Sequence, residues 1–241
     1  MGSKSIKVFI LAGGKGTRIR SLFPNIPKAL IIIQGKPFLE HQIQLLAKQG
    51  FRDFVLCLGY LAEQIVEFFG DGSRWGVNIE YSIEEKPLGT AGAINFAKSF
   101  FQDTSLILNG DTYLKENFQA LIDYHEELVK LTEAIGTIVL ISNQDTKRYG
   151  NVAIDQNGRI EGFWEKTSDR KSCYVNAGAY VLEPKLLNYI SDGKFVSLEK
   201  DIFPALLDED KNLYSFLAEG SFIDIGTPHG YHATERIFDG K

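Results

Sequence analysis

Residues 8–18 read VFILAGGKGTR, a short apolar run that passes directly into a loop with three glycines. Such a run followed by glycine is typical of a buried strand that ends in a tight loop. In an open α/β sheet, ligands gather at the carboxyl ends of the strands, and glycine lets backbone N–H groups approach phosphate oxygens. The stretch therefore predicts the first strand of an α/β sheet and a loop that binds a polyphosphate.

Short apolar runs and amphipathic stretches alternate after this loop, which is the pattern of βαβ units. Strands are expected over 8–11, 54–58, 79–81 and 105–108, and helices over 38–49, 61–69, 91–100 and 118–131. More closely spaced strands are expected over 137–141, 151–154, 159–164 and 174–182. This order predicts an α/β fold, a Rossmann-like three-layer sandwich with a mostly parallel, doubly wound mixed sheet.

Composition indicates one globular domain without an extended nucleic-acid or membrane surface. The chain has 241 residues, 44% of them hydrophobic, and a net charge of −5 without basic clusters. We find no apolar run of about 18 residues and no leader cleavage site, so a soluble, unexported protein is expected. Cys57 and Cys173 lie in apolar runs without metal-ligand spacing, which favours free thiols in a reducing cytoplasm.

Two basic residues accompany the glycine loop, Arg18 within it and Lys28 after Pro27. Arg18 can contact two phosphate oxygens at once, and Lys28 can place a point charge on the phosphorus under attack. A P-loop is excluded, because the chain has no glycine followed, after four intervening residues, by Gly-Lys-Ser/Thr. A dinucleotide fingerprint fails at Ile19, where a third small residue belongs. The remaining alternative is a glycine-rich packing turn.

The string GGKGTR at 13–18, followed by Pro27-Lys28, resembles the signature of the sugar nucleotidyltransferases, the nucleoside-diphosphate-sugar pyrophosphorylases. The later landmarks of that family follow in order through nearly the whole chain: EKPLGTAG, NGD, RYG, WEK, NAG and IDIGTP. The resemblance implies a glycosyltransferase-A-like nucleotidyltransferase fold in a single domain, 1–241. It also implies a nucleotide-binding half over about 1–133, a sugar-binding half over 134–241, and a short member without the C-terminal β-helix of many relatives.

Two carboxylates, Asp111 and Asp224, each follow an apolar run and are expected at the sheet edge that carries the glycine loop. Hard oxygen ligands of this kind suit Mg²⁺, with Mn²⁺ as an alternative, and the resemblance gives both residues the role of metal ligands. A turn or a helix cap is the alternative for each, and Asp224 stands in position to cap a helix that starts at Thr227.

The expected reaction needs no catalytic base, because the phosphate of a sugar 1-phosphate is already ionised near neutral pH. Its oxygen would attack the α-phosphorus of a nucleoside triphosphate in line, and pyrophosphate would leave. Arg18 and Lys28, with the metal, would stabilise the developing charge. The histidines have no part in this scheme, and His41 and His125 are expected on the surfaces of helices.

The resemblance places the sugar 1-phosphate on four residues of the second half. Lys166 would contact the sugar phosphate, Glu165 and Asn176 would contact sugar hydroxyls, and Gly150 would offer its backbone N–H. For the adjacent pair Glu165-Lys166, a solvated surface pair is the alternative.

A carboxylate pair before the turn at 86–89 bears on the choice of base. Guanine presents two adjacent donors that one carboxylate can accept together, whereas uracil and thymine show one donor between two acceptors. We therefore expect Glu85, with Glu84 as its substitute, to read guanine, unless both are simply exposed acids. The full set of expected nucleotide-binding residues is Leu11, Ala12, Gly13, Gly14, Lys15, Gly16, Thr17, Arg18, Glu84, Glu85, Gly89, Thr90, Asn109 and Gly110.

Within the family, the short length, Lys28-Ala29-Leu30 and Glu85 with the string GTAG at 89–92 most resemble D-glycero-D-manno-heptose 1-phosphate guanylyltransferases. The expected substrates are thus GTP and a heptose 1-phosphate, for bacterial surface polysaccharide. Mannose 1-phosphate is the next acceptor, followed by uridylyl or thymidylyl transfer. Monomer and dimer are both left open.

Two readings from other classes remain. A glycosyltransferase usually places its metal on Asp-x-Asp, where this chain has Asn109-Gly110-Asp111. An inactive regulatory relative that binds nucleotide sugar would be marked by the loss of Lys28, Asp111 or Asp224, all of which are present.

Overall fold

The computed structural model describes residues 6–142, 151–164, 174–228, 230–232 and 234. The chain forms two compact units, each assembled from separate stretches of sequence. The first unit consists of Met1–Pro87, Leu108–Glu116 and Gly220–Lys241, and the second of Leu88–Ile107 and Asn117–Glu219. The single domain and its two functional halves, divided after residue 133, stay predictions.

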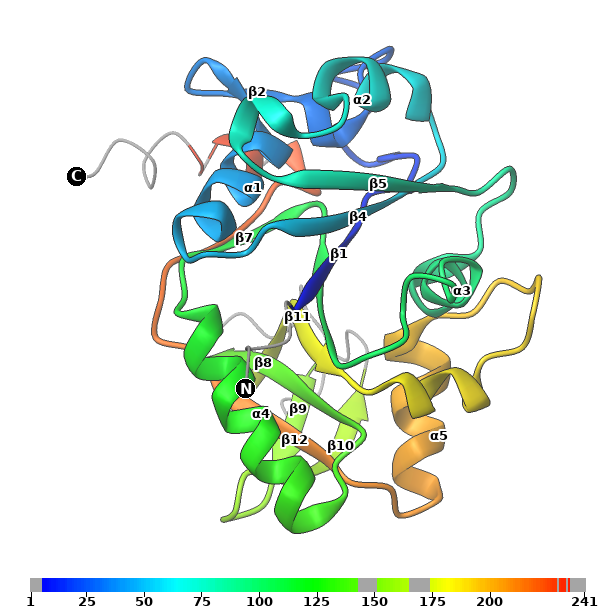
Figure 1. Ribbon diagram of the computed structural model, residues 1–241, viewed down its shortest axis with the longest axis vertical. Helices are drawn as coiled ribbons and strands as arrows, with labels where there is room; N and C mark the ends of the chain where they lie inside the picture. Colours follow the sequence, from blue (N-terminus) through cyan, green and yellow to red (C-terminus); the bar gives the residue numbers. More distant parts are fainter. Residues whose placement is uncertain (1–5, 143–150, 165–173, 229, 233, 235–241) are drawn as a thin grey trace. The chain divides into compact units, whose positions relative to one another are not determined.

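A parallel ladder forms the centre of the first unit (Figure 1). It consists of β1 (Lys7–Leu11), β4 (Asp53–Leu58) and β5 (Asn78–Ile83), in the order β1-β4-β5. The intervening helices are α1 (Phe38–Lys48) and α2 (Ala62–Phe69). Residues 8–10 and 54–58 are buried, as continuous apolar runs should be in a parallel sheet that is covered on both faces.

Two short antiparallel ladders complete the first unit. One joins β2 (Ile32–Ile33) to β3 (Lys36–Pro37), and the other joins β7 (Thr112–Leu114) to β13 (Phe222–Asp224). The 3₁₀ turns η1 (Lys28–Leu30) and η2 (Ser73–Trp75) lie between its other elements. A core cluster packs the two ladders together and consists of Ile19, Ile31, Ile33, Phe38, Ile223 and Ile225. It brings residues more than a hundred positions apart into one small core.

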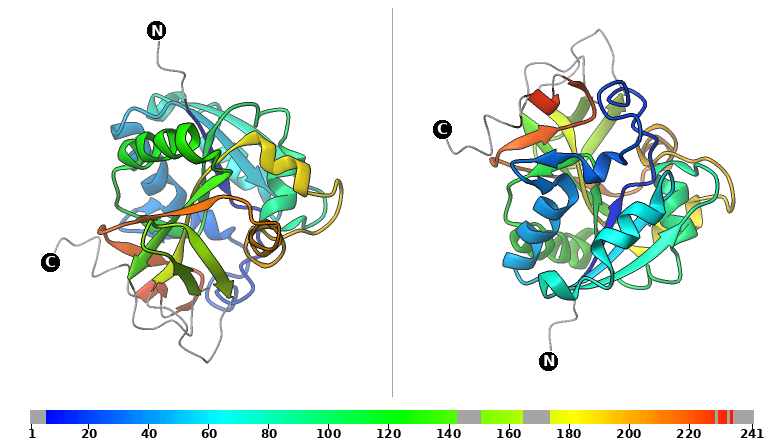
Figure 2. Two further views of the ribbon diagram at one scale, coloured as in Figure 1. Left: turned by 90° about the horizontal axis from the view of Figure 1, so that it is seen from below. Right: turned by 90° about the horizontal axis from the view of Figure 1, so that it is seen from above.

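The second unit contains a mixed ladder of five strands in the order β12-β8-β11-β9-β10. They are β8 (Gly136–Ser142), β9 (Asn151–Ile154), β10 (Ile160–Trp164), β11 (Tyr174–Leu182) and β12 (Leu213–Leu217), and only the β12–β8 pair is parallel. Its helices are α3 (Gly89–Phe96), α4 (Phe118–Thr132) and α5 (Phe203–Asp208). The left view of Figure 2 shows α5 nearly end-on. Two further helical segments are the 3₁₀ helix η3 (Pro184–Tyr189) and the π-helix η4 (Leu198–Ile202). Strand β6 (Ser105–Asn109) carries the chain into the first unit.

The predicted elements are found within a few residues of their expected bounds, and a mostly parallel mixed sheet with helices is confirmed. The predicted helix 91–100 ends earlier, at Phe96, and continues as turns to Phe101. Cys57 is a buried free thiol, as expected, whereas Cys173 lies outside the described residues. Among the helices that the structure describes, none is long and apolar enough to cross a bilayer.

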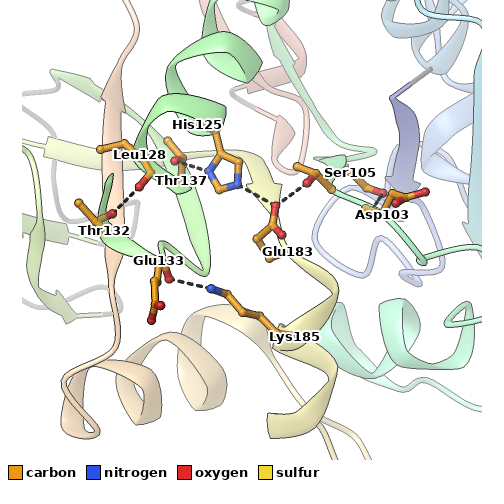
Figure 3. Close-up of polar contacts among 10 residues, drawn as sticks. Asp103, Ser105, His125, Leu128, Thr132, Glu133, Thr137, Glu183 and Lys185 are labelled. Atoms are coloured by element: carbon orange, nitrogen blue, oxygen red, sulfur yellow. Dashed lines mark hydrogen bonds and ion pairs between the residues drawn. The ribbon is translucent and has the colours of Figure 1, made fainter. Parts of the chain in front are cut away.

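The surface position expected for His125 is wrong. His125 is fully buried, and its ring nitrogens lie 2.8 Å from the hydroxyl of Thr137 and 3.3 Å from a carboxylate oxygen of Glu183 (Figure 3). The hydroxyl of Thr104 donates to the same carboxylate oxygen. His125 stands three or four residues after Leu121 and Ile122, so it shares the apolar face of α4. His41 is half-buried, with Nε2 at 2.8 Å from the carbonyl oxygen of Ile33.

Candidate active site

The glycine loop leaves the carboxyl end of β1, as the sequence predicts. The N–H of Ala12 donates to the carbonyl of Cys57 (2.8 Å), and the N–H of Tyr60 donates to the carbonyl of Gly13 (3.3 Å). From Gly14 the loop opens to solvent, and a Cβ added to Gly14 would meet nothing within 4 Å. The start of the loop is therefore held against β4, while its glycine-rich part has room for a ligand.

The side chain of Glu84 lies against the start of this loop. Its N–H donates to the carbonyl of Leu58 (2.9 Å) and extends the β4–β5 ladder by one residue. A Cβ on Gly13 would stand 2.9 Å from Oε1 of Glu84, and one on Gly59 would stand 3.1 Å from its Cγ. Glycine at both positions is thus what lets the carboxylate lie there. Glu85 is exposed instead.

The Glu84 carboxylate also affects the thiol of Cys57. Burial and, to a smaller extent, the negative charge of Glu84 together raise the pKa of the Cys57 thiol to about 12. Cys57 is the penultimate residue of β4, so the Glu84 carboxylate lies close to the strand end from which ligands are approached in sheets of this kind.

Lys28 and Asp111 form an ion pair, with Nζ at 2.5 Å from Oδ2. Lys28 is the first residue of η1, and its side chain is 12% exposed. Gly16, at φ +58°, brings the glycine loop against the methylene groups of the Lys28 side chain, since a Cβ on Gly16 would stand 3.5 Å from the Cβ of Lys28. The loop and the cation are therefore adjacent.

The turn that carries Asp111 is packed against the end of β1. The N–H of Gly110 donates to the carbonyl of Leu11 (2.9 Å). A Cβ on Gly110 would stand 2.9 Å from both the carbonyl oxygen of Leu11 and the Cβ of Ala12. Because only glycine permits this approach, the string Asn109-Gly110-Asp111 delivers its carboxylate beside the glycine loop.

Asp224 lies beside the same ion pair. The pairing of β13 with β7 sets Asp224 opposite Thr112, and the N–H of Ile225 donates to the carbonyl of Asp111 (3.0 Å). Burial raises the pKa of Asp224, and the negative charge of Asp111 raises it further, while Lys28, the N–H of Gly226 and Arg18 act in the opposite direction. Two carboxylates and one ammonium group thus converge in the first unit.

Glycine at position 226 permits this convergence. A Cβ there would stand 2.7 Å from Oδ1 of Asp224 and 2.8 Å from Nζ of Lys28. The N–H of Gly226 donates to Oδ1 of Asp224 (2.5 Å), so Asp224 closes a tight turn. The Thr227 hydroxyl accepts the N–H of Gly230 (3.1 Å), so the capping contact that was the alternative role for Asp224 is made by Thr227.

Gln42 is a site residue that the sequence analysis missed. It is buried on α1, and its side-chain amide donates to the backbone carbonyls of Asn109 (2.9 Å) and Thr112 (2.6 Å). These two carbonyls bracket Gly110-Asp111, so one amide group holds both sides of the turn. The available signal was a glutamine on the apolar face of a helix, beside Leu39, Ile43 and Leu46.

The chain matches one known protein family over nearly its whole length. The family model described as nucleotidyl transferase matches residues 7–238. The chain belongs to this family. Relatives include mannose-1-phosphate guanylyltransferase of Mycobacterium tuberculosis, 36% identical over 96% of this chain and 64% of its own length. A UTP–glucose-1-phosphate uridylyltransferase of Synechocystis is 35% identical over 94% of this chain and 61% of its own. The chain thus spans a little over three fifths of these nucleotidyl transferases.

Solved structures of the nucleotidyl transferase fold cover nearly all of the chain. HddC of Yersinia pseudotuberculosis, complexed with GMP-PN, superposes with a TM-score of 0.83 at 30% identity, over 97% of this chain and 99% of that chain. A Bacillus anthracis protein described as a glucose-1-phosphate thymidylyltransferase has a TM-score of 0.85 at 24% identity, over 96% and 94% of the two chains. The predicted Rossmann-like nucleotidyltransferase fold is confirmed.

The first unit therefore assembles most of the predicted nucleotide and metal residues: the glycine loop, Lys28, Glu84, Asp111 and Asp224. Arg18 is exposed on the loop, near enough to lower the pKa of Asp224. Glu85 is exposed in the turn that follows β5. Gly150, Glu165 and Lys166 lie outside the described residues. What each residue does in catalysis stays a prediction.

Gly89 and Thr90 have packing partners within the second unit. Gly89, at φ +75°, passes so close to Val196 that a Cβ would stand 2.4 Å from its carbonyl oxygen. The Thr90 hydroxyl donates to Oε2 of Glu199 (2.8 Å) and accepts the N–H of Leu198 (2.8 Å). These contacts account for the glycine and the threonine structurally, and nucleotide binding by either residue stays a prediction.

Proposed function

We propose that this nucleotidyl transferase transfers GMP from GTP to a sugar 1-phosphate and releases pyrophosphate. The observation that carries the proposal is the convergence of the glycine loop, Lys28, Asp111 and Asp224. A polyphosphate loop beside a cation and two carboxylates is suited to charge stabilisation in phosphoryl transfer, and no residue there is needed as a base.

In this mechanism a phosphate oxygen of the sugar 1-phosphate attacks the α-phosphorus of GTP. The bond from that phosphorus to the oxygen bridging to the β-phosphate breaks, and the electron pair leaves with pyrophosphate. Lys28 carries three N–H donors, one of which contacts Asp111, so it can stabilise the equatorial and leaving oxygens. Arg18, on the open loop, holds the leaving phosphates.

The two carboxylates fit a divalent cation. Burial raises the pKa of Asp224, and repulsion from the negative charge of Asp111 raises it further. A bound cation would offset this repulsion. Mg²⁺, with Mn²⁺ as an alternative, would be held by Asp111 and Asp224 and, when bound, would neutralise charge on the phosphate oxygens.

We assign guanine recognition to Glu84 rather than to Glu85. The carboxylate of Glu84 borders the nucleotide loop, whereas Glu85 is exposed. One carboxylate can accept both N1–H and the exocyclic amine of guanine, but it would face the N1 acceptor of adenine. The relatives named as guanylyltransferases and the GMP-PN complex of HddC agree with this choice of base.

For the acceptor we propose D-glycero-D-manno-heptose 1-phosphate, on the resemblance carried by Lys28-Ala29-Leu30 and by Glu85 with the string GTAG at 89–92. Lys166 would contact its phosphate, and Glu165, Asn176 and Gly150 its hydroxyls. Mannose 1-phosphate is the second candidate, since several relatives are named mannose-1-phosphate guanylyltransferases. Uridylyl transfer is third, because the Synechocystis relative carries that name. The product would supply bacterial surface polysaccharide.

A substrate panel tests the proposal. The four ribonucleoside triphosphates and dTTP are each combined with heptose, mannose and glucose 1-phosphates, and pyrophosphate release is measured. GTP should exceed the other nucleotides by up to about 10⁴-fold in kcat/KM, because a desolvated carboxylate without its donors is costly. Preference for UTP or dTTP would overturn the choice of base, and no pyrophosphate with any pair would overturn the activity.

Glu84→Gln separates the two candidate base readers. Replacing one carboxylate oxygen by an amide donor should raise the activation free energy that governs kcat/KM for GTP by about 1–3 kcal/mol. The kcat/KM for UTP should fall less or should rise, since uracil offers a carbonyl to that donor. The matched control is Glu85→Gln, which should behave as wild type with both nucleotides. The opposite pattern would return the role to Glu85.

A further inference from the structure

Glu199, at the start of η4, is the centre of a hydrogen-bond network within the second unit. Its Oε1 lies 3.0 Å from the hydroxyl of Tyr180, and its Oε2 lies 2.8 Å from the hydroxyl of Thr90 and 2.7 Å from that of Ser197. Tyr180 is fully buried, and Ser197 is nearly so. One carboxylate therefore meets three hydroxyls from β11, α3 and the start of η4.

The carboxylate of Glu199 sets the direction of these hydrogen bonds, and the second partner of each hydroxyl is consistent with it. Thr90 accepts the N–H of Leu198, and Ser197 accepts the N–H groups of Glu199 and Lys200. The hydroxyl of Tyr180 lies 2.8 Å from Nδ2 of Asn176 and accepts from it. A carboxylate only accepts hydrogen bonds, so each of the three hydroxyls donates its own hydrogen to Glu199, and each hydroxyl oxygen accepts the N–H that faces it.

This network sets the orientation of the Asn176 amide. Because the hydrogen of Tyr180 points to Glu199, the group of Asn176 that faces Tyr180 must be the NH₂ group. At the other end, Oδ1 of Asn176 accepts the N–H of Gly178 (2.9 Å). Both ends agree, and among the residues that the structure describes the second N–H of this amide has no partner, so it can donate to a ligand.

We propose that Glu199 is a positioning residue for the acceptor sugar. Through Tyr180 it fixes Asn176 so that a single amide N–H is presented to a sugar hydroxyl, and through Thr90 it ties that arrangement to the first turn of α3. The inference rests on the proposed function, in which Asn176 contacts the sugar. It adds to that function a selection for a hydroxyl oxygen, an acceptor, at this position of the sugar.

The hydrogen-bond path from Glu199 through Tyr180 to Asn176 is called the relay below. Two substitutions interrupt it at different points. Tyr180→Phe deletes the hydroxyl between Glu199 and Asn176 and keeps the buried ring. Glu199→Gln keeps the shape, but an amide nitrogen facing Tyr180 would donate to it and turn its hydrogen toward Asn176. Asn176 would then have to present Oδ1 to Tyr180 and NH₂ to the N–H of Gly178, which places two donors against each other.

The kinetic test measures KM for each substrate separately. In Tyr180→Phe and Glu199→Gln, KM for the sugar 1-phosphate should rise about tenfold, with KM for the nucleotide within twofold of wild type. The control is Asp192→Asn, which removes another carboxylate of the second unit that accepts a side-chain amide, from Asn95, and should change neither KM. A purely structural role would change thermal stability or both KM values together.

A deoxy-sugar series makes the test specific. The sugar 1-phosphate that lacks the hydroxyl contacted by Asn176 should be a poor substrate of wild type and should lose nothing further in Tyr180→Phe, whereas the other deoxy sugars lose the full tenfold. Equal losses for every sugar, or an unchanged KM in both variants, would overturn the positioning role.

A spectroscopic readout keeps the inference separate from the proposed function. The side-chain amide of Asn176, assigned in ¹⁵N–¹H spectra against Asn176→Asp, should show two resolved protons with slow exchange in wild type. Those signals should broaden or shift in Tyr180→Phe and Glu199→Gln but not in Asp192→Asn. Unchanged signals would overturn the relay, even in a protein that releases no pyrophosphate, while an inactive wild type would overturn the function.

Discussion

At the scale of single residues, Lys28 is the group on which the proposed chemistry depends most directly. Lys28→Met should lower kcat by about 10²–10³, the usual loss for one preorganised charge donor. Stability should change little, because the abandoned Asp111 side chain is 36% exposed and can be hydrated. Steady-state kinetics and thermal unfolding check this, with the exposed Lys36→Met as control. An unchanged kcat would remove Lys28 from the mechanism.

Asp111 and Asp224 bear on the metal. Asp111→Asn and Asp224→Asn should each raise severely the Mg²⁺ concentration needed for half-maximal activity, since each withdraws a hard anionic ligand. Without metal, Asp224→Asn should be at least as stable as wild type, because burial and Asp111 both disfavour its charge. Activity is titrated with Mg²⁺ after chelation, with the exposed Asp71→Asn as control. Normal turnover at low Mg²⁺ would contradict the ligand role.

At the scale of elements, α1 supports the active-site turn through Gln42. Gln42→Met should leave the carbonyls of Asn109 and Thr112 without this donor and lower the free energy of unfolding by about 1–3 kcal/mol. It should also reduce kcat, because Asp111 loses its fixed position. Denaturant unfolding and kinetics measure both effects. Gln44→Met, on the same helix, is the control. If kcat is retained despite lower stability, the turn is held by the Gly110–Leu11 contact alone.

The contact of His125 on α4 with Glu183, the residue that follows β11, predicts a pH dependence of stability. Burial opposes ionisation of Glu183, but hydrogen bonds from His125 and Thr104 outweigh it and hold the pKa of Glu183 below its usual range. A depressed carboxyl pKa stabilises the fold above the unfolded-state value of about 4.3, and this contribution is lost as pH falls through the folded-state pKa.

Glu183→Gln should therefore destabilise the protein by about 1–2 kcal/mol near pH 7, and the difference from wild type should shrink below about pH 4. Urea unfolding between pH 3 and 7 measures it, with Glu126→Gln as control. A difference that stays constant with pH would mean that Glu183 acts by shape and not by charge.

At the scale of the whole molecule, each unit combines residues that are distant in the sequence. The first unit recruits the turn with Asp111 and the strand with Asp224 to a glycine loop near the N-terminus. The short strands β7 and β13 that achieve this were not predicted. A strand of three residues carries too little periodicity to be recognised, and the pairing of these two strands depends on the core of Ile19, Ile223 and Ile225 around them.

Local sequence patterns were enough to predict the main strands and helices, the glycine loop, and the candidate site residues Lys28, Asp111 and Asp224. These follow from local patterns, since apolar periodicity and glycine act within a few residues of their own position. Tertiary structure decided that Glu84 and not Glu85 meets Gly13, that His125 is buried, and that Gln42 and Glu199 hold other residues in place. Side chains that are neighbours in the sequence point in different directions, and which of them meets a partner is decided by packing between segments far apart in the chain.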